Sequence, residues 1–228
     1  MLSLALALST CVASPGDPSP TALVLKVSRA EALPGSPSDP IRALYERGVP
    51  FSVFFEGVED RRELWDRHWA DSRLEEGYRI RAEAIPGRWH LLVVTVPSCS
   101  DTIGSLPYLA HLADAMPGLE LRVVDAEAGR FVLQRHRAPD GREATPTVLL
   151  LDEDYGLAGC WVEQPPELQA WWPENDRPEA PLEERLRIKM AWYAEDAGRS
   201  TLEMTLGMLE AAVRGERVCP GSEGGPDK

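Results

Sequence analysis

An apolar run rich in β-branched residues extends from Trp89 to Val96. This composition is typical of a strand that is buried on both faces of a parallel or mixed sheet. After a break at Pro97-Ser98, five apolar residues recur at three- and four-residue spacing: Ile103, Leu106, Leu109, Leu112 and Met116. That spacing predicts a helix with one apolar face. Cys99 is therefore expected where a buried strand passes into a helix.

The start of this helix carries the candidate chemistry. Ser98 is followed three residues later by Asp101, which resembles a capping box with Ser98 as the N-cap and Cys99 as the first helical residue. The partial positive charge at a helix N-terminus favours a thiolate, whereas a carboxylate one turn away opposes it. A nucleophilic cysteine and a buried structural cysteine are both compatible with this pattern.

The flanking sequence alternates between helical and extended patterns. The predicted helices cover 41–47, 51–56, 60–71, 74–85, 127–136, 165–172, 182–193 and 202–213, and further strands cover 119–125 and 157–162. With 228 residues, 43% of them hydrophobic, the chain can form one domain with appendages. The expected divisions are a signal-like or disordered segment 1–38, a domain 39–215 and a flexible tail 216–228. The domain comprises a helical arm 39–86, a core 87–172 and C-terminal helices 181–215.

Charge and cysteine usage exclude several functions. A net charge of −13 and a pI near 4.8 argue against nucleic acid or an anionic membrane surface as a partner. The four cysteines and four histidines show no metal-ligand spacing, so we expect no metal and no disulfide framework. Cys160 is expected to be a buried strand thiol, with an approach to Cys99 as the alternative, and Cys219 lies in the Pro/Gly-rich tail. A small basic cluster at Arg130, Arg135, His136 and Arg137 is either solvated surface or a dock for a carboxylate-bearing thiol.

The N-terminal residues do not decide between a cytoplasmic and an exported protein. Met1 to Ala13 is apolar but too short to span a bilayer, and it lacks the basic start of a signal peptide. Leu8 to Cys11 weakly resembles a lipobox, and a misassigned start site explains the segment equally well. We expect a cytoplasmic protein, with export to the cell envelope or lipid anchoring through Cys11 as the alternative.

The order of these elements resembles the thioredoxin-like superfamily. Strand, Cys99, a helix with Pro107, a second strand, and then Ala144 to Thr147 opening a further strand follow the order of that fold. The closer likeness is to a bacterial thioredoxin-family group with a W-C-G-D-C or W-C-G-D-A site, and it covers most of residues 40 to 212. Here the site reads Ser98-Cys99-Ser100-Asp101-Thr102, without the tryptophan, the glycine and the second cysteine.

The resemblance implies an α/β fold with a central mixed four-stranded sheet, flanked by helices and extended by helices at both ends. It implies that Cys99 is the nucleophile, with Asp101 and Thr102 tuning it. Thr145, a cis Pro146 and Ser98 would contact the substrate. Because Thr102 cannot resolve a mixed disulfide, an external small thiol would have to act as co-substrate.

Protein or small-thiol disulfides would be the substrates of such a monothiol exchange protein, without a bound cofactor. The alternative is a redox-inactive thioredoxin-like binding module, which the degenerate site motif favours. Enzymatic activity is left open between the two.

Overall fold

The computed structural model describes residues 39–219. The expectations for residues 1–38, including Cys11, and for residues 220–228 lie outside that range. The helices are α1 (Pro40–Arg47), α2 (Phe51–Glu56), α3 (Arg62–Asp71), α4 (Glu76–Glu83), α5 (Ser100–Ala115), α6 (Arg130–Arg135), α7 (Pro166–Asn175), α8 (Leu182–Asp196) and α9 (Arg199–Val213). The strands are β1 (Trp89–Thr95), β2 (Leu119–Asp125), β3 (Thr147–Leu151) and β4 (Leu157–Val162).

The four strands form one mixed sheet in the order β2-β1-β3-β4. β1 pairs parallel with β2 and antiparallel with β3, and β3 pairs antiparallel with β4. The parallel connection from β1 to β2 runs through α5, so the end of β1 leads directly into that helix. The predicted α/β architecture, a mixed four-stranded sheet flanked by helices, is confirmed.

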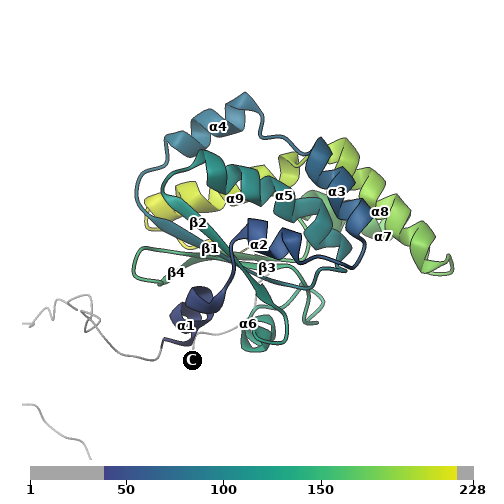
Figure 1. Cartoon of the computed structure of the whole chain (residues 1–228), viewed down its shortest axis with the longest axis horizontal. Helices are drawn as coiled ribbons and strands as arrows, with labels where there is room; N and C mark the ends of the chain where they lie inside the picture. Colours follow the sequence, from purple (N-terminus) through teal and green to yellow (C-terminus); the bar gives the residue numbers. More distant parts are fainter. Residues whose placement is uncertain (1–38, 220–228) are drawn as a thin grey trace, which may run out of the picture. The chain divides into compact units, whose positions relative to one another are not determined.

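Alternate residues of β1 face opposite sides of the sheet, as the pleat of a strand requires. Leu91 and Val93 belong to the larger apolar core, which includes residues of α5, α8 and α9. Leu92 and Val94 belong to a smaller core shared with α1 and α6. Figure 1 shows α4, α5 and α9 on one side of the sheet and α1 and α6 on the other. Both faces of β1 are thus covered, which explains its continuous apolar sequence.

The C-terminal segment departs from the expectation that it is a flexible tail from residue 216. Val218 forms a parallel bridge with Gly159 on β4, and the Cys160 N–H donates to the Val218 carbonyl at 3.0 Å. The described fold therefore continues past residue 215, the boundary expected for the domain. Within residues 39–219, no helix has the length and apolar character needed to cross a membrane.

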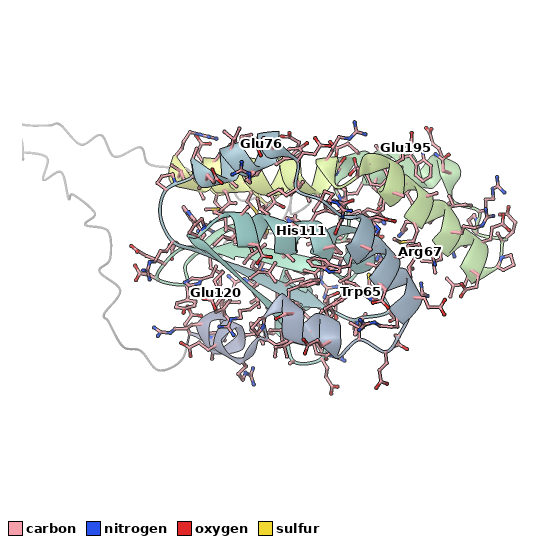
Figure 2. The ribbon with its side chains drawn as sticks, turned by 45° about the horizontal axis from the view of Figure 1, so that its top comes forward. Trp65, Arg67, Glu76, His111, Glu120 and Glu195 are labelled. Atoms are coloured by element: carbon pink, nitrogen blue, oxygen red, sulfur yellow. A yellow bond between two sulfur atoms is a disulfide. The ribbon has the colours of Figure 1, made fainter. Side chains whose placement is uncertain are left out.

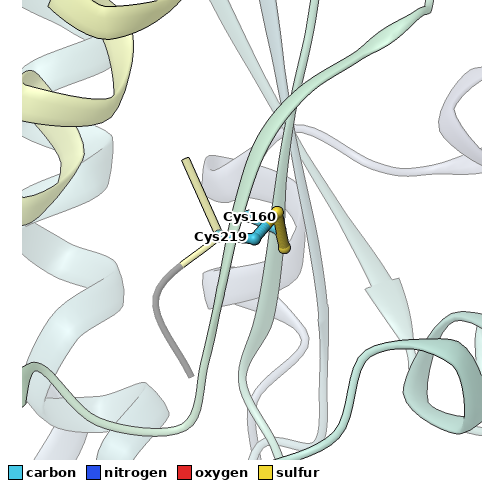
Figure 3. The surroundings of a disulfide bond; sticks show 2 residues. All are labelled: Cys160 and Cys219. Atoms are coloured by element: carbon cyan, nitrogen blue, oxygen red, sulfur yellow. A yellow bond between two sulfur atoms is a disulfide. The ribbon is translucent and has the colours of Figure 1, made fainter. Parts of the chain in front are cut away.

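This pairing along β4 also overturns the prediction for the cysteines. It places Cys219 beside Cys160, and the two form a disulfide with a Cα–Cα distance of 4.5 Å (Figure 3). Cys160 is therefore not a free buried thiol on its strand. The expectation that the chain has no disulfide framework was wrong. Spacing alone could not reveal the pair, because its members are 59 residues apart.

Candidate functional site

Cys99 lies in the turn between β1 and α5, where it is the N-cap residue of the helix. Its thiol is free and half-buried, and Sγ donates to the Thr145 carbonyl oxygen at 3.0 Å. The Thr145–Pro146 peptide bond is cis. Among residues 39–219, the Thr145 N–H has no hydrogen-bond acceptor. The sulfur therefore lies against a half-buried backbone segment that retains an unused donor.

The predicted capping box is not formed. The helix begins at Ser100 rather than at Cys99, and no side chain caps its N-terminus. Asp101 instead bonds to side chains of α8. Its two carboxylate oxygens accept hydrogen bonds from Lys189 Nζ at 2.9 Å and from the Tyr193 hydroxyl at 3.0 Å. The Lys189 ammonium offers the carboxylate a full positive charge, whereas a backbone amide offers only a partial one, which favours the lysine as partner.

This ion pair is buried behind the cysteine. The side chains of Asp101 and Lys189 are only 5% and 11% exposed. Tyr193 is fully buried, and its burial, with the adjacent Asp101 carboxylate, raises the pKa of the phenol well above its ordinary value. Tyr193 thus stays a neutral donor to Asp101. Helix α8 is thereby joined to the first turn of α5 through groups that sequence spacing did not connect.

The close approach of α8 depends on Gly104. A Cβ atom at this position would lie 2.4 Å from the Tyr193 ring, so no larger residue fits without displacing the ring. A glycine inside a helix is otherwise unfavourable. The glycine was the one sequence signal that another element packs tightly on this face of α5.

Thr102 lies one helical turn after Cys99 and is fully buried. Its hydroxyl is hydrogen-bonded to the hydroxyl of Thr95 at the end of β1. The Thr102 hydroxyl thus ties α5 to β1 and makes no hydrogen bond to the sulfur. The position that a resolving cysteine would occupy holds a structural contact.

Two residues of α3 donate hydrogen bonds to backbone carbonyls near Cys99, one before it in the chain and one in α5. Trp65, labelled in Figure 2, lies on α3. It is fully buried, and its indole N–H donates to the Pro97 carbonyl at 2.9 Å. His68 donates from Nε2 to the Gly104 carbonyl at 3.1 Å, and burial lowers its pKa. The sequence predicted that residues 39–86 form a helical arm. It did not indicate that the arm holds the backbone beside Cys99.

A cavity of about 240 Å³ opens at the sulfur. We call it the Cys99 cleft, and it is lined by Arg61, Ser98, Cys99, Ser100, Trp172, Leu182, Arg185, Leu186 and Lys189. A neighbouring cavity of about 630 Å³ shares Trp172, Arg185 and Lys189 with it. The C-terminal helices α7 and α8 therefore form a wall of the site.

The structure brings most of the predicted site residues together. Ser98 and Cys99 line the cleft, Thr145 contacts the sulfur, and Asp101 and Thr102 lie buried behind it. The basic cluster at Arg130, Arg135, His136 and Arg137 does not line the cleft. Its histidine is buried, and burial lowers the pKa of that imidazole. Across residues 39–219, no group of His, Cys, Asp and Glu side chains could hold a metal ion.

Comparison with solved structures gives two matches of the same extent. A crystal structure of a protein of unknown function from Pseudomonas aeruginosa is 24% identical, with a TM-score of 0.56, and the match covers 74% of this chain and 96% of that one. The crystal structure of an HIV epitope-scaffold is 23% identical with a TM-score of 0.56, covering 75% of this chain and 97% of that one. At this identity the likeness concerns the fold alone.

Comparison with curated proteins gives no match. A family model described as Thioredoxin matches residues 48–179, which is more than half of the chain. The matched segment begins in the turn before α2 and includes the whole sheet, the cysteine turn and Thr145. The chain belongs to the thioredoxin family.

Proposed function

We propose that this protein is a monothiol thiol-disulfide exchange protein in which Cys99 is the nucleophile. The observation that carries the proposal is the half-buried Cys99 sulfur, which lies at a cleft, at the start of α5 and against Thr145. Unpaired N–H groups in the first turn of a helix favour negative charge at the sulfur. Membership of the thioredoxin family makes disulfides the natural substrate class.

The reaction proceeds in two exchanges. The Cys99 thiolate attacks one sulfur of a substrate disulfide, a new sulfur–sulfur bond forms, and the second substrate sulfur leaves with the electron pair as a thiolate. A small external thiolate then attacks the mixed disulfide and leaves as a disulfide with the substrate half, which restores the Cys99 thiolate. Electrons are conserved, because one disulfide is consumed and one is formed.

Neighbouring groups take different parts in this proposal. The Thr145 N–H and carbonyl lie where they can pair with the backbone of an extended substrate. Ser98 lines the entrance beside the sulfur. Asp101 and Thr102 hold the first turn of α5 in place through α8 and β1, and we assign them as positioning residues rather than as groups that touch the substrate.

The Cys160–Cys219 disulfide supports the exported alternative over a cytoplasmic one. Structural disulfides persist mainly in oxidising compartments and are rare where glutathione and thioredoxin keep thiols reduced. The expected cytoplasmic location is therefore the weaker proposal of the two. In an oxidising compartment the small thiol that resolves Cys99 would be the limiting reactant.

A coupled assay tests the exchange reaction. The protein would be mixed with a mixed-disulfide peptide substrate and reduced glutathione, and the formation of glutathione disulfide would be followed. We expect catalysis above the uncatalysed rate for the unmodified protein and none for Cys99→Ser. Activity that survives in Cys99→Ser would refute the assignment of the nucleophile.

The second candidate, a redox-inactive binding module, is favoured by one observation. Thr102 occupies the resolving position and bonds to Thr95, so the chain itself cannot complete a dithiol cycle. A folded protein whose Cys99 reacts with small disulfides no faster than free cysteine would support this candidate. Such a result would remove the enzymatic proposal.

A further inference from the structure

We infer that the Cys99 cleft recognises a small thiol or disulfide through a carboxylate, and that Arg61 is the residue that binds this carboxylate. The inference rests on the proposed exchange at Cys99 and specifies its substrate class. Every charged side chain that lines the cleft is a cation: Arg61, Arg185 and Lys189. This is unexpected in a chain with a net charge of −13.

Two of these cations are partly neutralised from behind. Arg185 donates through Nε and Nη2 to both oxygens of Asp176 at 2.8 Å, and Lys189 donates to Asp101 at 2.9 Å. Each retains donors, because a guanidinium has five N–H groups and an ammonium has three. Lys189 also lies over the Trp172 ring, at 4.6 Å from its centroid. These contacts hold both cations in the wall of the cleft.

Arg61 differs from the other two. Within residues 39–219, no carboxylate lies within salt-bridge distance of its guanidinium, and its side chain makes no hydrogen bond. The residue is half-buried at the start of α3, in the left-handed backbone conformation with φ at 57°. A non-glycine residue rarely adopts this conformation. The cleft thus contains one partly buried positive charge that a ligand can neutralise.

Apolar side chains share the α7 and α8 wall of the cleft with Arg185 and Lys189. Leu182, Leu186 and the Trp172 ring face the same space as the sulfur and the cations. A volume of about 240 Å³ accommodates a small molecule rather than a folded protein surface. The matching ligand carries a sulfur for Cys99, a carboxylate for Arg61 and a short apolar part between or beside them. A cysteine-containing peptide or another small carboxylated thiol has this chemistry.

Two reagents with the same reactive group and opposite charge test the inference. 2-Sulfonatoethyl methanethiosulfonate is anionic, and 2-trimethylammonioethyl methanethiosulfonate is cationic. In both, the thiolate attacks the sulfenyl sulfur and methanesulfinate leaves with the electron pair. The rates of Cys99 modification would be measured by mass spectrometry and divided by the rates for a free small thiol.

We expect the normalised rate to favour the anionic reagent, and we expect Arg61→Ala to reduce this preference roughly three- to ten-fold. Arg61→Lys should retain most of it. Arg187→Ala changes the net charge equally but removes an exposed residue outside the cleft lining, so it should leave the preference intact. Added salt should weaken the preference in the unmodified protein.

The outcomes separate this inference from the proposed function. If Cys99 reacts readily with both reagents and Arg61→Ala changes nothing, recognition of a carboxylate by Arg61 is refuted while exchange at Cys99 stands. If Cys99 reacts with neither reagent in the folded protein, the exchange function itself fails. A cationic preference in the unmodified protein would also overturn the inference.

Discussion

At the scale of single residues, the site depends on one glycine that allows larger side chains to meet. Gly104 permits the Tyr193 ring to lie on α5, and only then can the Tyr193 hydroxyl reach Asp101. Asp101 in turn holds Lys189 at the edge of the cleft. The geometry around Cys99 therefore depends on contacts between α5 and α8 that do not involve the sulfur itself.

Replacing Gly104 by alanine tests this dependence. The new Cβ would overlap the buried Tyr193 ring, and overpacking of this kind costs about 1–3 kcal/mol of unfolding free energy. Gly207→Ala is the matched control, because that helical glycine has open space around its Cβ position and alanine should gain up to about 1 kcal/mol there. Urea denaturation measures both. Equal stability of the two variants would show that α8 does not pack on α5 as described.

At the scale of elements, the pattern of apolar residues predicted the helices and strands well. Each helix buries one apolar face, and the central strand is buried on both faces. The run before Cys99 is β1, and the spaced leucines after it form α5. The contacts between elements could not be predicted from the sequence. Asp101 and Lys189 are far apart in the chain, and so are Cys160 and Cys219. The first pair meets because α8 packs on α5, and the second because the C-terminal segment pairs with β4.

The Cys160–Cys219 disulfide should make a large contribution to stability. By the chain-entropy relation, closing a loop of 59 residues stabilises the folded state by about 4 kcal/mol. We expect Cys219→Ser, and the unmodified protein treated with a phosphine reductant, to unfold at lower urea concentrations. Cys99→Ser without reductant is the control and should retain the disulfide. Identical unfolding curves for oxidised and reduced protein would contradict this contribution.

At the scale of the whole molecule, the pKa shifts of all four histidines change the pH dependence of stability in the same direction. Burial lowers the pKa values of His68, His90, His111 and His136, so the folded protein holds these imidazoles neutral. A histidine whose pKa is lower in the folded state stabilises the protein above its unfolded pKa of about 6.5. That contribution is lost as the pH falls through the folded pKa.

Acidification should therefore lower the stability of the protein. We expect the Tm, followed by circular dichroism, to fall between pH 7.5 and pH 5.5. Burial raises the pKa of Glu163, so protonation of this carboxyl stabilises the folded protein as the pH falls through its titration. This single group opposes the combined effect of the four histidines. His68→Gln, whose amide can still donate to the Gly104 carbonyl, should show a smaller fall. An unchanged pH dependence in this variant would argue against a buried neutral His68.

The sequence predicted the cysteine turn but not the cleft around it. The cysteine, its place at a strand-to-helix junction and its proximity to Thr145 followed from sequence order and the family resemblance. The cleft did not, because Arg61, Trp172 and Lys189 come from three separated segments whose charges and rings look like ordinary surface in the sequence. Their convergence is a property of the packed helices.

The most direct test of the central claim is the lifetime of a mixed disulfide on Cys99. The protein would be loaded with a labelled thiol through a disulfide, freed of small molecules, and sampled by mass spectrometry. We predict that the adduct persists until a small thiol is added, whereas Thr102→Cys releases it unaided. Release from the unmodified protein without added thiol, or failure of the adduct to form on Cys99, would contradict monothiol exchange at this site.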